Sequence, residues 1–200
     1  MKVRWPVVVV VCSVVAAGVL VGGYWDRVDH AAVNARHAAA SAQLRSSVLS
    51  ERIQAVQELE RVTRQSPGDQ PAVTTELSAF IRSVASSPNC PDVAVGRDVQ
   101  SALSVLARRT PAGDGDAVVD LHGACLRNAA MSKINLVYAN LAGTDLGGVD
   151  LSWSVLDGAD LTGADLSGAN LSYAHVVDAR LASVDLTGAN VVGINMNYSR

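Results

Sequence analysis

The side chains best suited to metal or covalent chemistry are a few cysteines and histidines that are widely separated along the chain. His122 and Cys125 form an HxxC pair, and Cys90 precedes them. A zinc site takes four ligands, and this set supplies three, so we predict no metal site and no cofactor. Cys90 and Cys125 have a second use if the chain is exported, because an oxidising compartment would allow them to form a disulfide.

His175 and Asp178 are three residues apart and could serve acid–base chemistry. Such a pair still needs a nucleophile and a pocket beside it, and the sequence shows neither. A solvated histidine is the simpler interpretation, and we predict that the protein is not an enzyme. An enzyme with a site near His122 or His175 is the least favoured alternative.

Negative charge is concentrated in the C-terminal part of the chain. The whole sequence has a net charge of −3, while residues 119–200 hold eight Asp and no Glu against four Lys or Arg, a difference of 8 − 4 = 4 charges. A chain with this balance has no electrostatic attraction for phosphate backbones, so we predict no nucleic-acid partner.

The element that carries these residues has a five-residue period, seen in LDGADLTGADLSGANL at 156–171. In an α-helix, leucines five apart rotate by about 140° each time and make no stripe. In a flat strand, an odd period sends them to alternate faces. The period makes a core only if the chain turns a corner once per repeat, which predicts a solenoid.

The register continues without a gap from Val119 to Tyr198, which is sixteen repeats. Ala stands two residues before the centre in nine repeats, Asp or Asn directly before it in eleven, and Gly two residues after it in eight. Asp and Asn favour turn geometry by accepting backbone N–H groups. Twelve central residues are Leu, and we predict that they form the structural core: Leu121, Leu126, Leu136, Leu141, Leu146, Leu151, Leu156, Leu161, Leu166, Leu171, Leu181 and Leu186.

The repeats ADLTG, ADLSG and ANLSY resemble the A(D/N)Lxx signature of the pentapeptide-repeat family over residues 119–198. The resemblance implies a right-handed quadrilateral β-helix with twenty residues per coil, and therefore four coils. Together with the N-terminal helices this gives an α+β fold class.

Twenty residues per coil place Trp153 directly above or below Tyr173. We predict that this aromatic pair is an interaction patch for a protein partner, which the sequence does not identify. The chain end GINMNYSR offers no capping helix, so the last coil exposes strand-like edges. A homodimer through this uncapped C-terminal coil is a further expectation.

Residues 1–25 are predicted to be a transmembrane anchor. The uncharged run at 6–23 spans about 27 Å as a helix, close to a hydrocarbon core of about 30 Å. Trp5 marks one end, and Tyr24 and Trp25 mark the other. A cleaved signal peptide is the alternative. Lys2 and Arg4 favour a cytoplasmic N-terminus with the repeats outside, although Arg36 and Arg45 make this bias small.

Residues 26–110 are predicted to be helical, as a hairpin resembling HEAT-type repeats. Apolar residues recur at helical spacing within 49–62, 73–84 and 95–106, and SPG at 66–68 ends the first of these runs. The last of these helices is expected from about residue 92 to residue 108. The turn-rich stretch at 111–118 is predicted to be a linker, and 119–200 the repeat domain.

These elements together predict a membrane-anchored, non-enzymatic scaffold that binds a protein through the β-helix. The family resemblance also implies a second function, because some pentapeptide-repeat proteins imitate DNA in charge and shape and bind gyrase. A soluble gyrase-binding inhibitor is therefore the main alternative. Four coils and a membrane anchor fit it less well.

Overall fold

The computed structural model describes residues 30–87, 89–197 and 199. The expected anchor at 6–23 lies outside these residues. Within the described part of the chain, no helix is both long and apolar enough to cross a lipid bilayer.

Among the described residues, four helices precede the coils: one over residues 30–43, α2 (Leu49–Gln65), α3 (Gln70–Val84) and α4 (Arg97–Arg108). Short 3₁₀ turns occupy Pro67–Asp69 and Pro111–Gly113, each with a proline in its first turn. The sequence suggested that the last helix starts near residue 92, and this start was wrong. Gly96 is extended (φ −58°, ψ 154°), so α4 begins at Arg97.

The helices share a core to which α2, α3 and α4 contribute Leu59, Leu77 and Leu103, all at most 1% exposed. A partly buried ion pair between Arg52 Nε and Asp98 Oδ2, at 2.6 Å, joins α2 to α4. The helix at 30–43 contributes Ala40, 2% exposed, to the same core, and His37 Nε2 lies 3.2 Å from Glu76 Oε2 of α3. It therefore belongs to the same packed group.

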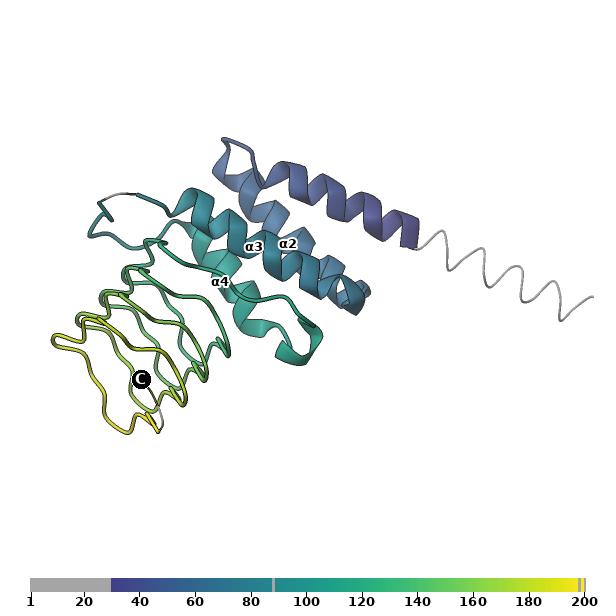
Figure 1. Ribbon diagram of the computed structural model, residues 1–200. Coiled ribbons are helices and arrows are strands. Elements are labelled where there is room, and N and C mark those ends of the chain that lie inside the picture. Colours follow the sequence, from purple (N-terminus) through teal and green to yellow (C-terminus); the bar gives the residue numbers. More distant parts are fainter. Residues whose placement is uncertain (1–29, 88, 198, 200) are drawn as a thin grey trace, which may run out of the picture.

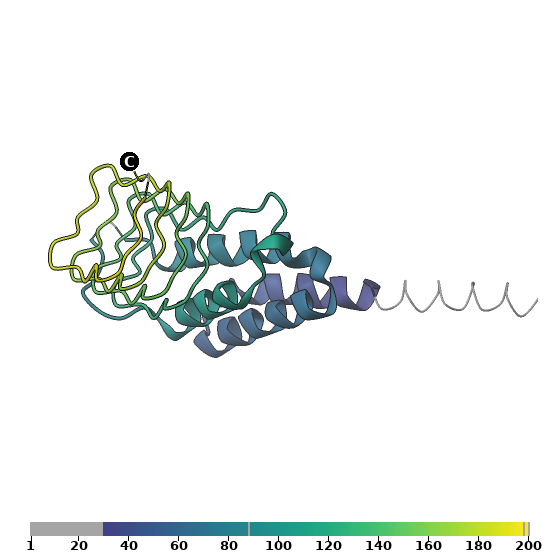
Figure 2. The same ribbon diagram turned by 90° about the horizontal axis from the view of Figure 1, so that it is seen from below.

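After the helices the chain winds into stacked coils, which lie against one end of the helical group in both views (Figure 1, Figure 2). Parallel bridges join residues twenty apart, from Asp120↔Asn140 through to His175↔Asn195. Each side contributes one bridge residue and then a turn, so among the described residues the coils contain isolated bridges and no longer strand. The spacing confirms four repeats per coil.

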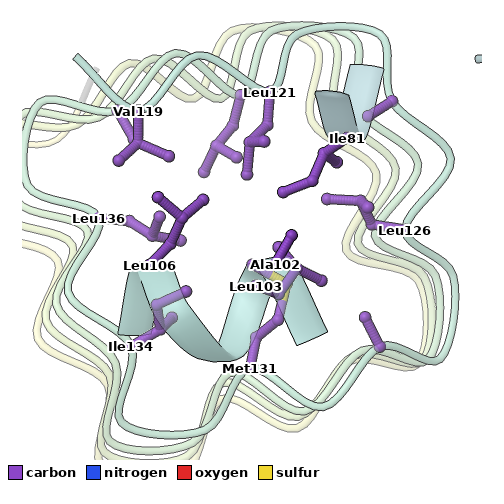
Figure 3. Packing of buried hydrophobic residues seen from close by; sticks show 14 of the residues in the cluster. Ile81, Ala102, Leu103, Leu106, Val119, Leu121, Leu126, Met131, Ile134 and Leu136 are labelled. Atoms are coloured by element: carbon purple, nitrogen blue, oxygen red, sulfur yellow. The ribbon is translucent and has the colours of Figure 1, made fainter. Parts of the chain in front are cut away.

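Figure 3 shows the interior of the coil, with Leu121, Leu126, Met131 and Leu136 pointing inward from four successive sides. We number these sides 1 to 4 in that order, so side 4 lies opposite side 2. Ten of the predicted core leucines are at most 2% exposed. The other two, Leu181 and Leu186, are only partly buried, because they lie on the coil farthest from the helices and no described coil covers them.

The helices close the other end of the coil. Ile81 of α3 and Ala102, Leu103 and Leu106 of α4 point into its mouth (Figure 3), and all four are at most 1% exposed. The helices therefore cover the leucines of the first coil, as a further coil would.

The stretch at 111–118 fixes this arrangement. The Asp114 carboxylate is buried and accepts hydrogen bonds from Gln70 Nε2 (2.9 Å), Thr74 Oγ1 (2.9 Å) and Arg109 Nε (2.7 Å). Arg109 Nη1 also donates to the Asn135 carbonyl of the first coil at 2.8 Å. Since a buried charge is stable only when paired and hydrogen-bonded, these contacts hold the joint to α3 and to the first coil.

Candidate interaction surface

Trp153 and Tyr173 form a stacked pair at the corner between sides 3 and 4. Their ring centroids lie 4.4 Å apart and their planes meet at 17°. The side chains remain exposed, at 57% and 47%. Both residues have a left-handed backbone, with φ of 59° and 57°. Stacked aromatic rings on a fixed backbone give a surface that loses little conformational entropy when a partner binds.

A third aromatic side chain, Tyr138, lies at the next corner and was not predicted as part of the patch. It is 74% exposed, and its ring lies directly over Gly158, where a Cβ would approach Tyr138 Cδ1 to 2.5 Å. Tyr138 stands two residues after a central Leu, as Trp153 and Tyr173 stand after theirs. That shared repeat position was the signal that could have identified it.

The two histidines considered for catalysis lie in different surroundings. His122 Nδ1 is 2.7 Å from Asp120 Oδ1, and Arg82 pairs with the same carboxylate. His175 is exposed and is bridged to Val155 and Asn195. In the described ranges, no three His, Cys, Asp or Glu side chains group in a way that could hold a metal ion.

The cysteines that the sequence left open form a disulfide. Cys90 and Cys125 are bonded with a Cα–Cα distance of 5.3 Å. The bond ties the loop between α3 and α4 to side 2 of the first coil. Next to it, the Cys125 N–H donates to the Ala85 carbonyl at 2.6 Å.

The aspartates of side 2 align in a column, Asp145, Asp165 and Asp185. Arg127 Nη2 lies 3.0 Å from Asp145 and 2.9 Å from Asp165, so a cation reduces the negative field there. Burial alone would raise the pKa of Asp165, but hydrogen bonds from Ser167 and the charge of Arg127 lower it overall. Asp165 Oδ1 also accepts the Ser167 N–H at 2.8 Å, as the predicted turn role requires.

Comparison with known proteins gives one family. The family described as Pentapeptide repeats matches residues 134–172 and 164–197, in eight copies. Among curated proteins, none matches this chain.

Several solved structures are similar to part of this chain. HetL, a pentapeptide repeat protein involved in heterocyst differentiation regulation in the cyanobacterium Nostoc, is 32% identical over 38% of this chain and 35% of its own, with a TM-score of 0.37. A pentapeptide repeat protein of the Arabidopsis thaliana thylakoid lumen is 32% identical over 38% of this chain and 52% of its own, with the same TM-score. Rfr23 from the cyanobacterium Cyanothece is 29% identical over 47% and 77%, with a TM-score of 0.28. The chain thus spans about a third of the length of HetL and half that of the lumen protein.

Proposed function

Because the repeats make this chain a member of the pentapeptide-repeat family, whose proteins form right-handed quadrilateral β-helices, we propose that it is a membrane-anchored, non-enzymatic scaffold for a protein partner. The observation that carries the proposal is the exposed, stacked pair of Trp153 and Tyr173. Large aromatic side chains dominate the energetics of protein interfaces, and a contiguous exposed group of them marks a candidate contact surface.

The apolar run at 6–23 supports the anchor, and the Cys90–Cys125 disulfide supports the orientation. Disulfides persist in oxidising compartments and are rare where glutathione keeps thiols reduced. Lys2 and Arg4 before the run independently favour a cytoplasmic N-terminus. Both observations point to a coil that lies outside the cytoplasm, joined to the membrane through the helices.

The gyrase-binding alternative requires a dense and continuous negative field that imitates DNA. Arg127 lies between Asp145 and Asp165, and Arg180 Nη1 lies 3.2 Å from Asp160 Oδ2, so cations interrupt that field on sides 1 and 2. Inhibition of gyrase supercoiling by the full chain would favour this alternative over the scaffold.

Site-specific photo-crosslinking in native membranes tests the scaffold. In one variant a photoreactive amino acid replaces Ser152, beside Trp153. In the matched control it replaces Thr187 on side 2. We expect a defined crosslinked protein from position 152 that is absent from position 187 and is lost when Trp153→Ser is added. Equal products from both positions, or products unaffected by Trp153→Ser, would contradict the proposal.

Two further measurements test its membrane part. Alkaline-washed membranes should retain the full chain, and its recovery in the soluble fraction would exclude the anchor. Alkylation of intact cells before lysis should find Cys90 and Cys125 unreactive until a reductant is added. Rapid alkylation without a reductant would contradict the proposed orientation.

The proposal also includes the homodimer expected at the last coil, where Val191, Val192 and Met196 are exposed at 42%, 63% and 38%. Light scattering of the detergent-solubilised chain should give the mass of a dimer. Replacement of Val192 by Asp should give the mass of a monomer. A monomer without the substitution would remove this part of the proposal.

A further inference from the structure

Side 4 of the coil differs from the other sides in the residues that it shows to solvent. The position directly before the central residue is Asp or Asn in most repeats, but on side 4 it is Val155 and His175 in the two middle coils. Val137 and Val177 are half-buried on the same side. Side 4 therefore presents half-buried Val155 and the exposed imidazole of His175, with Val137 and Val177 beside them, where the family pattern places carboxylates and amides.

The aromatic side chains stand at the two corners that bound this side. Trp153 and Tyr173 lie at the corner shared with side 3, and Tyr138 lies at the corner shared with side 1. All three have φ between 56° and 59°, where a residue with a side chain is less stable than glycine by about 1–2 kcal/mol. The three rings thus occupy corners whose left-handed backbone disfavours residues with side chains. They extend the apolar surface of side 4 on both edges.

A side chain of the preceding coil compensates for the missing turn-forming carboxylate at position 175. In most repeats an Asp or Asn accepts the N–H two residues ahead, as Asp165 does for Ser167. At His175 the acceptor is different: Asp157 Oδ1 of the preceding coil accepts the Val177 N–H, at 2.9 Å. The turn after position 175 is therefore retained, although position 175 carries neither Asp nor Asn.

The charges on side 4 in the middle coils are negative. Asp157 lies on the side itself and Asp178 at its corner with side 1, and within the described residues neither has an ion pair. Arg180, which follows Asp178, is held by Asp160 of side 1 at 3.2 Å. Lys133 stands at the far corner, in the first coil. An apolar surface around Val155 beside carboxylates that no ion pair in the described part of the chain neutralises is complementary to an apolar group flanked by cations.

We infer that side 4 binds a protein segment in which an aliphatic side chain is flanked by Lys or Arg. The aliphatic group covers Val155 and the rings of Trp153 and Tyr173, and the cations pair with Asp157 and Asp178. The carboxylates disfavour anionic lipid headgroups and acidic peptides at the same place. The inference rests on the proposed scaffold function and specifies the chemistry of the partner.

Trp153 provides the readout. In the full chain in nanodiscs, Trp5→Phe and Trp25→Phe leave it as the single tryptophan. The probe is a synthetic peptide with a central leucine between lysines, and its matched control has glutamates in place of the lysines. We expect a saturable change in Trp153 emission with the basic peptide, and binding of the acidic peptide at least about tenfold weaker, which corresponds to 1.4 kcal/mol.

Variants then locate the binding surface. Asp157→Asn together with Asp178→Asn should weaken binding of the basic peptide about three- to tenfold, since exposed ion pairs contribute modestly. The Asn side chain at 157 can still accept the Val177 N–H, so the coil is retained. Val155→Asn should also weaken binding. Asp185→Asn on side 2, the control, should leave it unchanged.

Three results would overturn the inference: no saturable change with the basic peptide, equal binding of both peptides, or unchanged binding by the Asp157 and Asp178 double variant. These failures are distinct from failure of the scaffold. If the crosslinks from position 152 persist while charge selectivity is absent, the scaffold stands and the partner chemistry is wrong. If the crosslinks are absent too, the scaffold itself fails.

Discussion

Gln100 of α4 pairs with Ala130 of the first coil as one strand residue pairs with another. Its side-chain amide donates to the Ala130 carbonyl at 2.8 Å and accepts the Ala130 N–H at 3.0 Å. In the coils beyond, the corresponding bonds come from backbone, as when the Asp150 N–H donates to the Ala129 carbonyl at 3.2 Å. A helix side chain thus completes the edge of the coil where no preceding coil exists, and it protects that edge from pairing with another chain.

Replacement of Gln100 by Met keeps the volume and the helix propensity but removes both hydrogen bonds. We expect the Ala130 amide to exchange its hydrogen faster and the free energy of unfolding to fall by about 1 kcal/mol. Gln54→Met, on the exposed face of α2, is the control and should have little effect. Unchanged exchange at Ala130 would mean that Gln100 does not close the edge.

The repeat period was sufficient to predict the coil, because its corners depend on residues five apart and its ladder on residues twenty apart. That is why the alignment of Trp153 with Tyr173 followed from counting alone. The contact between Gln100 and Ala130 does not follow from any period, since it depends on how α4 docks against the coil. The start of α4 was misplaced for a related reason: the chain bends at Asp92 and Val93 and is extended at Gly96, and helical spacing does not register these backbone conformations.

The patch itself was only partly predictable. Tyr138 shares its repeat position with Trp153, but the residue twenty positions later is Gly158. Tyr138 therefore has no aromatic neighbour one coil away that would have drawn attention to it. Val155 and His175 were visible as departures from the pattern. The sequence did not show that the side they share is bounded by exposed aromatic rings at both corners. That arrangement is seen only in the structure.

Gly158 and Gly168 form a matched pair that tests the position of Tyr138. Their φ values are 67° and 66°, but a Cβ on Gly158 would meet the Tyr138 ring at 2.5 Å, while one on Gly168 would meet nothing within 4 Å. Gly168→Ala should therefore lower the free energy of unfolding only through the unfavourable left-handed backbone of alanine, by about 1–2 kcal/mol. Gly158→Ala should lose more, measured by urea unfolding.

The excess loss in Gly158→Ala arises from the Tyr138 ring, so it should disappear when Tyr138→Ala is present in both backgrounds. If Gly158→Ala and Gly168→Ala are equally destabilised with Tyr138 in place, the ring does not rest on Gly158.

The disulfide should contribute to stability by closing a loop between positions 35 residues apart. The loss of chain entropy in the unfolded state predicts a contribution of about 3–4 kcal/mol. Cys90→Ser should therefore lower the melting temperature of the oxidised chain markedly. It should also abolish the dependence of that temperature on reductant. Cys12→Ser is the control, and a chain whose melting is insensitive to reductant would show that the bond does not form.

Acid should destabilise the coil through the aspartates of side 2. The pKa of folded Asp165 is lowered: burial opposes the shift, and the Ser167 hydrogen bonds and the Arg127 charge outweigh it. A lowered pKa in the folded state stabilises the fold fully above the unfolded value of about 3.9. That contribution is lost as the pH falls below this value through the folded pKa. The melting temperature should accordingly be steady between about pH 7 and 5 and decline below about pH 4.

Asp165→Asn separates the charge from the turn, because the amide oxygen can still accept the Ser167 N–H while Arg127 loses one carboxylate partner. The variant should be less stable than the unmodified chain at neutral pH and should lose less stability on acidification, so the two melting curves converge at low pH. Asp116→Asn, at an exposed position in the joint, should follow the unmodified chain throughout. If Asp165→Asn and the unmodified chain decline in parallel, the acid sensitivity arises from other carboxylates and the Arg127 contact does not stabilise side 2.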